Sequence, residues 1–448
     1  MKFMVLKEVI TPDIPVLQFG FAARTHKSEG VHDDVYAHVV WLEGDETCVI
    51  IMLDLIGGDL SFAAGIRQAI YERFGIPGEQ VVVSYTHSHS IVAITGEDRA
   101  LAGNRVSIAA ENFGYDDDDS GMDYTEDLRY YRTVRDIIID MIGRCKAEAA
   151  DGDIYINKGV SRFGVSRRKP SPDGGVLWEP YDCDAARDTD LYVLKLCDKS
   201  GNIRAIIYNY ACHPTSLGPD NYLISADYPG AVAKRLEARY PGAVAVFLQG
   251  CGADIKPFQT GITGLFRSIS FDELETEGEQ MSNDVISLLD ADGWRKLDGT
   301  VRIKTETVKL YCEPWPRERW ADMASDPNES PHRKKSARKN LKRYDDGTVT
   351  HYLPYTMSCL KLDESVCIVT LPCEVVNAIG KRIKSLFADG IITLGYTNNV
   401  SCYIPTRRVS EEGGYEAKTF IGAGVTGPFV HETEDIIVGH AAAMIQSF

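Results

Sequence analysis

Continuous apolar runs alternate with amphipathic stretches along most of the chain. Seven short runs predict strands covered on both faces, because most of them lack the alternation of a strand with one solvent face. They comprise residues 48–53, 81–85, 191–196, 205–210, 244–248, 366–371 and 391–394. Between these runs, apolar residues recur at the spacing of an amphipathic helix over residues 61–74, 126–150, 228–240, 270–289, 374–387 and 431–445. The alternation indicates an α/β fold with a mixed, largely parallel sheet flanked by helices.

The sequence predicts a single catalytic domain over residues 1–448 that contains one charged insertion or lid. Residues 313–346 are highly charged and contain the basic run HRKKSARKNLKR. We interpret this segment as a solvated helix or lid rather than as an anion-binding surface. No internal repeat is evident.

Composition narrows the classes of function. The 448 residues include 48 Lys and Arg against 65 Asp and Glu, a net charge of −17 that disfavours nucleic acids and anionic membranes as partners. No apolar run approaches a bilayer span, and the N-terminal stretch is too broken for a signal peptide, so we expect a cytoplasmic protein. Eleven cysteines without a CxxC pair indicate buried, reduced thiols.

Three histidines follow predicted core strands. His87 and His89 lie in the sequence THSHS directly after residues 81–85, and an HxH pair offers two imidazoles to one metal ion. His213 follows residues 205–210, and Pro214 forces a turn behind it. The alternative is that these histidines hydrogen-bond the end of the sheet without binding a ligand.

Two further strand ends carry carboxylates. The sequence QGCGAD follows residues 244–248, and the N–H groups of Gly250 and Gly252 are candidates for holding an oxyanion beside Asp254. A tight structural turn is the alternative there. Glu374 follows the strand predicted at residues 366–371 and opens the helix predicted at residues 374–387. Capping of that helix is the alternative to a catalytic role. We interpret Cys251 as a packed thiol, because no local base is visible.

These motifs together resemble the neutral ceramidase family, the non-lysosomal zinc amidases. The resemblance covers about residues 20–430, with five motifs in the family's order. The motifs are YTHSHS at 85–90, ACHPT at 211–215 with SADYPG at 225–230, LQGCGADIKP at 248–257, LPCE at 371–374, and SCYIPT at 401–406 with Tyr415 and Glu416.

The resemblance implies one catalytic zinc ion held by four side chains, which are His87, His213, Glu374 and Tyr403. It implies that His89 transfers a proton or contacts substrate, and that Arg167 or its neighbour Arg168 binds substrate. Asp254 corresponds to the family's Asp in the glycine turn, and Tyr415 lies in the family's final motif. The family's serine falls on Gly250 here, and we expect no C-terminal β-sandwich domain.

The sequence therefore predicts a cytoplasmic, zinc-dependent hydrolase that cleaves an amide, ester or lactone bond of a small soluble substrate through an activated water. Lactones and sugar-derived compounds are included because no lipid channel is evident. A ceramidase or other N-acyl lipid amidase is one alternative, and a metal-binding protein without catalysis is another. We expect no nucleic-acid partner and no stable membrane association, and a homo-oligomer is compatible with the sequence.

Overall fold

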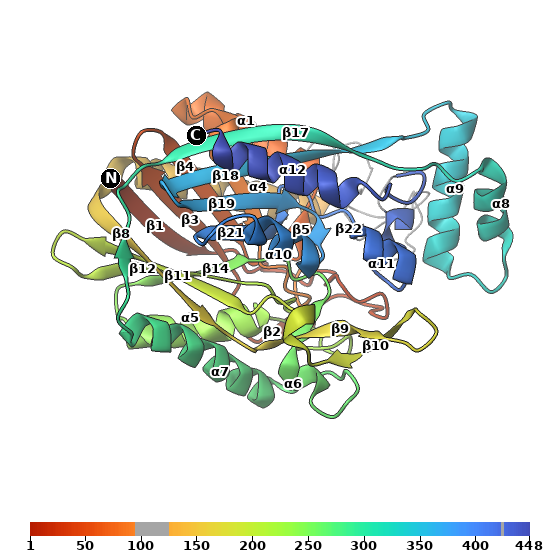
Figure 1. The fold of residues 1–448 in the computed structure, drawn as a ribbon, viewed down its shortest axis with the longest axis horizontal. Helices are drawn as coiled ribbons and strands as arrows, with labels where there is room; N and C mark the ends of the chain where they lie inside the picture. The colour runs from red at the N-terminus through yellow and green to blue at the C-terminus, as the bar shows by residue number, and fades with distance from the viewer. Residues whose placement is uncertain (95–124, 423–424) are drawn as a thin grey trace.

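The computed structural model describes residues 1–94, 125–422 and 425–448. One large mixed sheet organises them (Figure 1). Its strands run in the order β14 (Val244–Gln249), β12 (Ile203–Tyr210), β11 (Asp190–Asp198), β8 (Ala150–Val160), β1 (Lys2–Val9), β3 (Tyr36–Glu43), β4 (Thr47–Leu53), β6 (Val81–Tyr85), β21 (Ile391–Thr397), β19 (Val366–Pro372), β18 (Tyr352–Asp363) and β17 (Arg302–Tyr311). All seven predicted strands are present, and the α/β class with a mixed sheet is confirmed.

The prediction of a largely parallel sheet is wrong. Among the strands on this path, parallel pairing joins only β4 to β6, β12 to β14 and β19 to β21. The other neighbours pair antiparallel, as β1 does with β3 and β17 with β18. Long antiparallel strands such as β1, β8, β17 and β18 carry exposed polar positions, so they lack the continuous apolar pattern that marks the parallel units.

Helices cover the outer faces of the sheet. Helices α1 (Leu60–Phe74) and α4 (Thr125–Glu148) share a core with β3, β4 and β6. Helices α5 (Asp227–Arg239) and α7 (Phe271–Asp290) cover β11, β12 and β14, as Figure 1 shows along the lower edge. Helices α10 (Asn377–Ser385) and α12 (Thr433–Gln446) share a core with β18 and β19.

The sheet folds over on itself, because β14 contacts β4, β6 and β21 although it lies at the far end of the strand order. A fourth core fills the space between the two halves with alternate residues of the strands, such as Ile50, Ile207 and Ile368. The strands are therefore buried on both faces, which explains their continuous apolar runs.

Local signals set several helix boundaries. The Asp59 side chain accepts a hydrogen bond from the Phe62 N–H at 2.8 Å, and Gly75 ends α1 with a φ of 70°. Ser270 and Glu273 form a reciprocal capping box at the start of α7. Glu374 does not open α10, because it lies in the short strand β20 (Glu374–Val375) and the helix begins at Asn377. Capping therefore does not explain this carboxylate.

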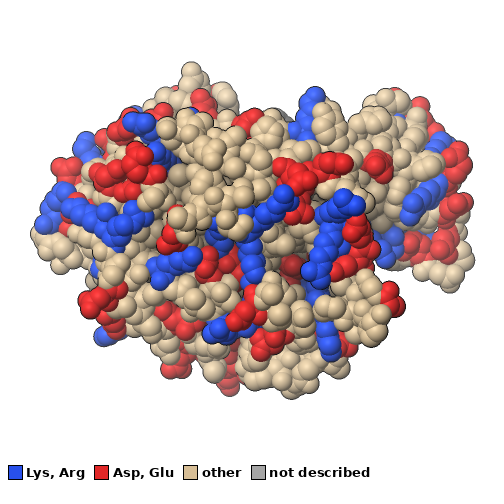
Figure 2. Space-filling model, in the orientation of Figure 1, with Lys and Arg blue, Asp and Glu red and all other residues tan. Residues whose placement is uncertain are grey.

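The charged segment predicted over residues 313–346 forms two helices, α8 (Arg317–Ser325) and α9 (Pro331–Asp345), at one end of the molecule (Figure 1). On the face shown in Figure 2, basic and acidic side chains are interspersed, without a broad basic surface on that face. None of the described helices combines the length and the apolar character that crossing a membrane requires. The eleven cysteines are all free thiols, and ten of them are buried.

Candidate metal centre

The candidate site lies at the ends of the three parallel strand pairs. Each pair belongs to a βαβ unit, and in each unit a polar side chain follows one of the two strands. His87 follows β6, His213 follows β12, and Glu374 follows β19. Loops at the carboxyl ends of such strands are where α/β sheets form their sites. The folding of the sheet brings these three ends together although they lie far apart in the sequence.

The side chains converge to hydrogen-bonding distances. The Glu374 Oε2 atom lies 3.2 Å from His87 Nε2 and 3.6 Å from His213 Nε2. His89 Nε2 lies 3.0 Å from His213 Nε2. The ligand atoms of the three imidazoles all lie within 4.8 Å of one another, and all three rings are buried. The structure thus brings together three of the four predicted metal ligands and the neighbouring His89.

The hydrogen bonds of His87 show what this cluster lacks. His87 Nδ1 lies 2.5 Å from the carbonyl oxygen of Ile56, which only accepts, so Nδ1 carries the proton. In the neutral ring, Nε2 then carries a lone pair and no proton, and it faces the Glu374 carboxylate oxygen. That oxygen is buried and has no hydrogen-bond partner among the described residues. Two lone pairs at 3.2 Å repel each other unless a cation or proton lies between them, so the donor set fits a bound metal ion.

Strained backbone holds these strand ends in position. His87, Cys373 and Tyr396 have φ values of 65°, 67° and 54°, in the left-handed region that non-glycine residues rarely adopt. Each lies just after or at the end of a core strand around the site. Such strain costs of order 1–3 kcal/mol per residue and persists at functional sites.

Tyr396 is a site residue that the sequence analysis did not single out. Its hydroxyl oxygen lies 3.1 Å from His213 Nδ1, and its ring centroid lies 4.4 Å from that of His87. The hydrogen bond orients the His213 ring so that Nε2 faces Glu374. The available signal was weak, a single tyrosine at the end of an apolar strand.

His89 lies on the cavity side of the cluster in a tightly packed niche. A Cβ atom on Gly20 would lie 2.2 Å from His89 Nδ1, so this position requires glycine. The Arg24 guanidinium donates a hydrogen bond of 2.5 Å to the His89 carbonyl oxygen. Burial, reinforced by the His87 ring and nearby cations, holds the pKa of His89 well below its usual range. His89 is therefore a neutral imidazole in this arrangement.

A cavity of about 400 Å³ opens onto the cluster. His87, His89 and Glu374 line its inner end, and Tyr403 and Tyr415 line one wall. Tyr403 pairs with Glu374 across two short parallel strands, β20 and β22 (Tyr403–Ile404), which places the fourth predicted ligand beside the third. Burial and the Glu374 carboxylate raise the pKa of Tyr403 well above its usual range.

The predicted substrate arginines lie behind this wall rather than in it. Arg167 donates to Glu416 Oε1 at 2.8 Å, and Arg168 donates to Glu416 Oε2 at 2.5 Å, with all three side chains buried. The Arg167 guanidinium lies 5.4 Å from the ring centroid of Tyr403 and 5.6 Å from that of Tyr415. Arg167 and Arg168 are not among the residues that line the cavity, so they support the tyrosines from behind.

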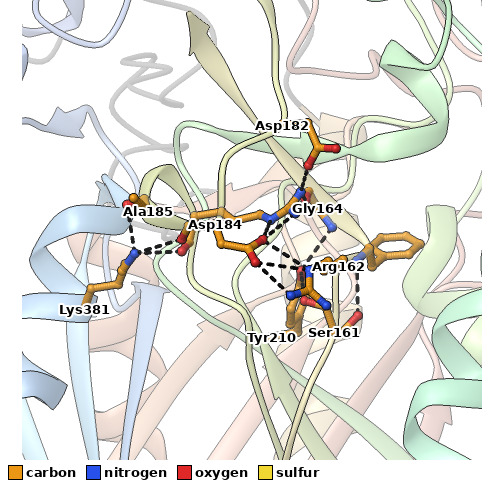
Figure 3. Close-up of polar contacts among 10 residues, drawn as sticks. Ser161, Arg162, Gly164, Asp182, Asp184, Ala185, Tyr210 and Lys381 are labelled. Atoms are coloured by element: carbon orange, nitrogen blue, oxygen red, sulfur yellow. Dashed lines mark hydrogen bonds and ion pairs between the residues drawn. The ribbon is translucent and has the colours of Figure 1, made fainter.

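Polar contacts fix the strand that carries these arginines, β9 (Gly164–Pro170) (Figure 3). The Gly164 N–H donates to the Tyr210 hydroxyl at 3.0 Å, and this hydroxyl donates to the Ser161 carbonyl at 3.2 Å. On the other side, Lys381 of α10 donates to the Ala185 carbonyl at 2.9 Å. Strand β9 is thus tied directly to the end of β12, and it is linked to helix α10 through residues 185–187, because Arg187 donates to the Gly164 carbonyl at 2.9 Å.

The glycine turn does not form the predicted oxyanion site. The N–H of Gly250 donates to the Tyr210 carbonyl and that of Gly252 to the Gly250 carbonyl, at 2.9 and 2.8 Å, so neither is free. The glycines are required instead by close packing, because a Cβ on Gly252 would lie 2.7 Å from the Cys212 nitrogen. Asp254 accepts a hydrogen bond of 2.7 Å from the Asn377 N–H, and burial raises its pKa to about 6.

Comparison with known proteins is consistent with this geometry. The family model described as neutral/alkaline non-lysosomal ceramidase, N-terminal, matches residues 7–261, more than half of the chain. The chain belongs to this ceramidase family. The family includes hydrolases whose activity depends on a metal ion, in agreement with the convergent imidazoles.

Solved structures show the ceramidase fold over the whole chain. The neutral ceramidase from Pseudomonas aeruginosa superposes with a TM-score of 0.74 at 17% identity, covering 100% of this chain and 75% of that one. A ceramidase complexed with C2 gives a TM-score of 0.72 at 17% identity, covering 99% and 74%. At this identity the likeness concerns the fold alone. A comparison with curated protein sequences gives no match.

Proposed function

We propose that this ceramidase-family protein is a zinc-dependent hydrolase that cleaves an amide, ester or lactone bond of a small substrate. The observation that carries the proposal is the buried Glu374 oxygen, which has no hydrogen-bond partner among the described residues, faces the unprotonated Nε2 of neutral His87 and lies 3.6 Å from His213 Nε2. His87, His213, Glu374 and Tyr403 would hold the ion, as the family resemblance implies. Nitrogen and oxygen donors of this kind suit zinc, and they also accept iron or manganese.

A divalent ion bound there supplies Lewis acidity, which polarises a carbonyl and lowers the pKa of water. The protein's own residues supply the rest. His89 lies at the cavity face of the cluster, where its imidazole would act as the proton-transfer group between water and the leaving group. The Ile56 carbonyl and the Tyr396 hydroxyl keep the His87 and His213 rings oriented.

The size of the cavity favours a small substrate. A volume of about 400 Å³ lies at the lower end of the range for small-molecule sites. Hydrolysis of a ceramide or another N-acyl lipid is the second candidate, and family membership favours it. A metal-binding protein without catalysis is the third candidate, and the buried imidazole cluster alone is compatible with it.

Metal analysis of the purified protein, combined with a hydrolase panel, tests the proposal. The His87→Ala variant should lose both the bound metal and the activity, because it removes the nitrogen nearest to Glu374. His440→Ala is the matched control, since that histidine is partly exposed on α12 and pairs with Glu306. Circular dichroism checks that both variants fold.

The outcomes separate the candidate functions. Full activity of metal-free protein, or unchanged metal content in His87→Ala, would refute the proposal. Release of fatty acid from detergent-solubilised N-acyl-sphingosine, without turnover of small amides, esters or lactones, would favour the ceramidase candidate. Tight metal binding without turnover of any of these compounds would favour the non-catalytic candidate.

A further inference from the structure

One wall of the cavity, formed by α9 and the residues around Lys418, carries two cations. Arg333, in the first turn of α9, and Lys418, just before η3 (Thr419–Gly422), both line the cavity that contains His87 and Glu374. Helix α9 packs against η3, so the two cations come from adjoining elements. The charged segment over residues 313–346 therefore contributes to the cavity.

The charge of this wall is the reverse of the charge of the chain. Among the described residues that line the cavity, the acidic side chain is Glu374, which belongs to the candidate metal centre, and the remaining charged side chains are Arg333 and Lys418. The chain as a whole has a net charge of −17. A cationic wall in an acidic protein attracts anions to that point of the surface.

Each of these two cations has at least one N–H donor without a hydrogen-bond partner among the described residues. Arg333 Nη1 pairs with Glu329 at 3.1 Å, but the Arg333 Nε atom is buried and has no hydrogen-bond partner there. A buried N–H without a partner is unfavourable, and a ligand oxygen would satisfy it. The Lys418 side chain is exposed, and its ammonium forms no ion pair or hydrogen bond with the described residues.

We propose that Arg333 and Lys418 form a subsite for an anionic group of the substrate, so that the preferred substrates are small N-acyl compounds carrying a carboxylate or phosphate. The proposal rests on the hydrolase function proposed above. Guanidinium and ammonium donors form charge-assisted hydrogen bonds with both kinds of anion. Arg333 and Lys418 are thus specificity-determining residues, and the metal centre performs the reaction.

A panel of four matched amides tests this subsite on the metal-loaded protein. N-hexanoylethanolamine is neutral, N-hexanoylglycine carries a carboxylate and N-hexanoyl-O-phosphoethanolamine carries a phosphate on the amine side. N-adipoylethanolamine carries a carboxylate on the acyl side. The measured quantities are kcat, KM and kcat/KM for each compound, together with calorimetric binding isotherms to metal-stripped protein, in which no turnover occurs.

At least one anionic amide should exceed the neutral amide in kcat/KM by tenfold or more, mainly through a lower KM. Arg333→Gln and Lys418→Gln should each reduce this preference about tenfold, since a hydrogen bond to a charged group contributes on that order. The neutral amide should lose much less than the anionic amides in either variant, because it has no charged group for these residues to bind. Arg338→Gln is the matched control, because Arg338 is an exposed cation on the same helix that does not line the cavity.

A neutral amide hydrolysed as well as the anionic ones, or a preference retained in both variants, would overturn the subsite. If none of these amides is hydrolysed, the binding isotherms still decide the subsite, and the esters and lactones of the hydrolase panel decide the proposed function separately. Equal affinity for charged and neutral amides would then overturn it. The comparison of the glycine and phosphoethanolamine compounds shows whether the subsite prefers a carboxylate or a phosphate.

Discussion

Glu416 is the side chain whose replacement most directly tests how the site is supported. It neutralises two buried guanidinium groups, with Arg167 Nε at 2.8 Å and Arg168 Nη1 at 2.5 Å. The side chains of Glu416 and Arg167 are 1% and 3% exposed, so neither charge is accessible to solvent. Glu416→Gln keeps the shape of the side chain but leaves both cations without this counter-charge.

Loss of one partner from a buried ion pair costs about 3–5 kcal/mol. We therefore expect Glu416→Gln to lower the free energy of unfolding by about this amount, which is a large part of the total stability of a typical protein. Urea denaturation followed by tryptophan fluorescence measures it, and Trp178 is a suitable reporter because its ring lies 4.4 Å from the Arg167 guanidinium. Glu412→Gln is the control, since that carboxylate contacts Arg168 at 3.1 Å but is 20% exposed and should cost about 1 kcal/mol or less.

The pH dependence of stability gives an independent measurement. Burial opposes ionisation of Glu416, but Arg167 and Arg168 outweigh it and lower the pKa of this carboxyl below its usual value. The stabilising contribution is therefore complete above the unfolded-state pKa of about 4.3 and is lost as the pH falls through the lower folded-state pKa. Glu416→Gln should lack this acidic loss of stability. A variant within about 1 kcal/mol of the wild type at pH 7 would refute the reasoning.

Three further predictions concern the elements around the site. Tyr396→Phe removes the partner of His213 Nδ1 and should lower metal affinity roughly 10- to 100-fold in a chelator competition assay, while unchanged affinity would show that the hydroxyl does not orient the ring. Gly252→Ala places a methyl group 2.7 Å from the Cys212 nitrogen and should lower the melting temperature, so a wild-type value would contradict the close packing. Asp254 has a pKa raised to about 6 by burial, so its contribution to stability is complete at low pH and lost as the pH rises through 6. Asp254→Asn should abolish this loss, which urea midpoints between pH 4 and 7 would detect.

The local sequence pattern predicted the strands that are buried on both faces. The continuous apolar runs identified β4, β6, β11, β12, β14, β19 and β21, because these strands are covered on both faces. The antiparallel strands β1 and β18 were not predicted, because each mixes exposed and buried positions and so lacks a continuous apolar run. The same reasoning placed His87 and His213 correctly at strand ends, but it misplaced Glu374 at the start of a helix.

By itself, the sequence determined the strand ends that carry polar residues and the motifs of the ceramidase family. Only the tertiary structure decided which of these residues meet. The folding of the sheet over its own central core brings His87, His213 and Glu374 together, and periodicity along one chain contains no information on that register. The structure also pairs Arg167 with Glu416, outside the cavity lining, and includes Arg333 in that lining. The orientation of Arg167 depends on its buried ion pair with Glu416, which lies 249 positions away in the sequence, and only tertiary packing brings these two charges together.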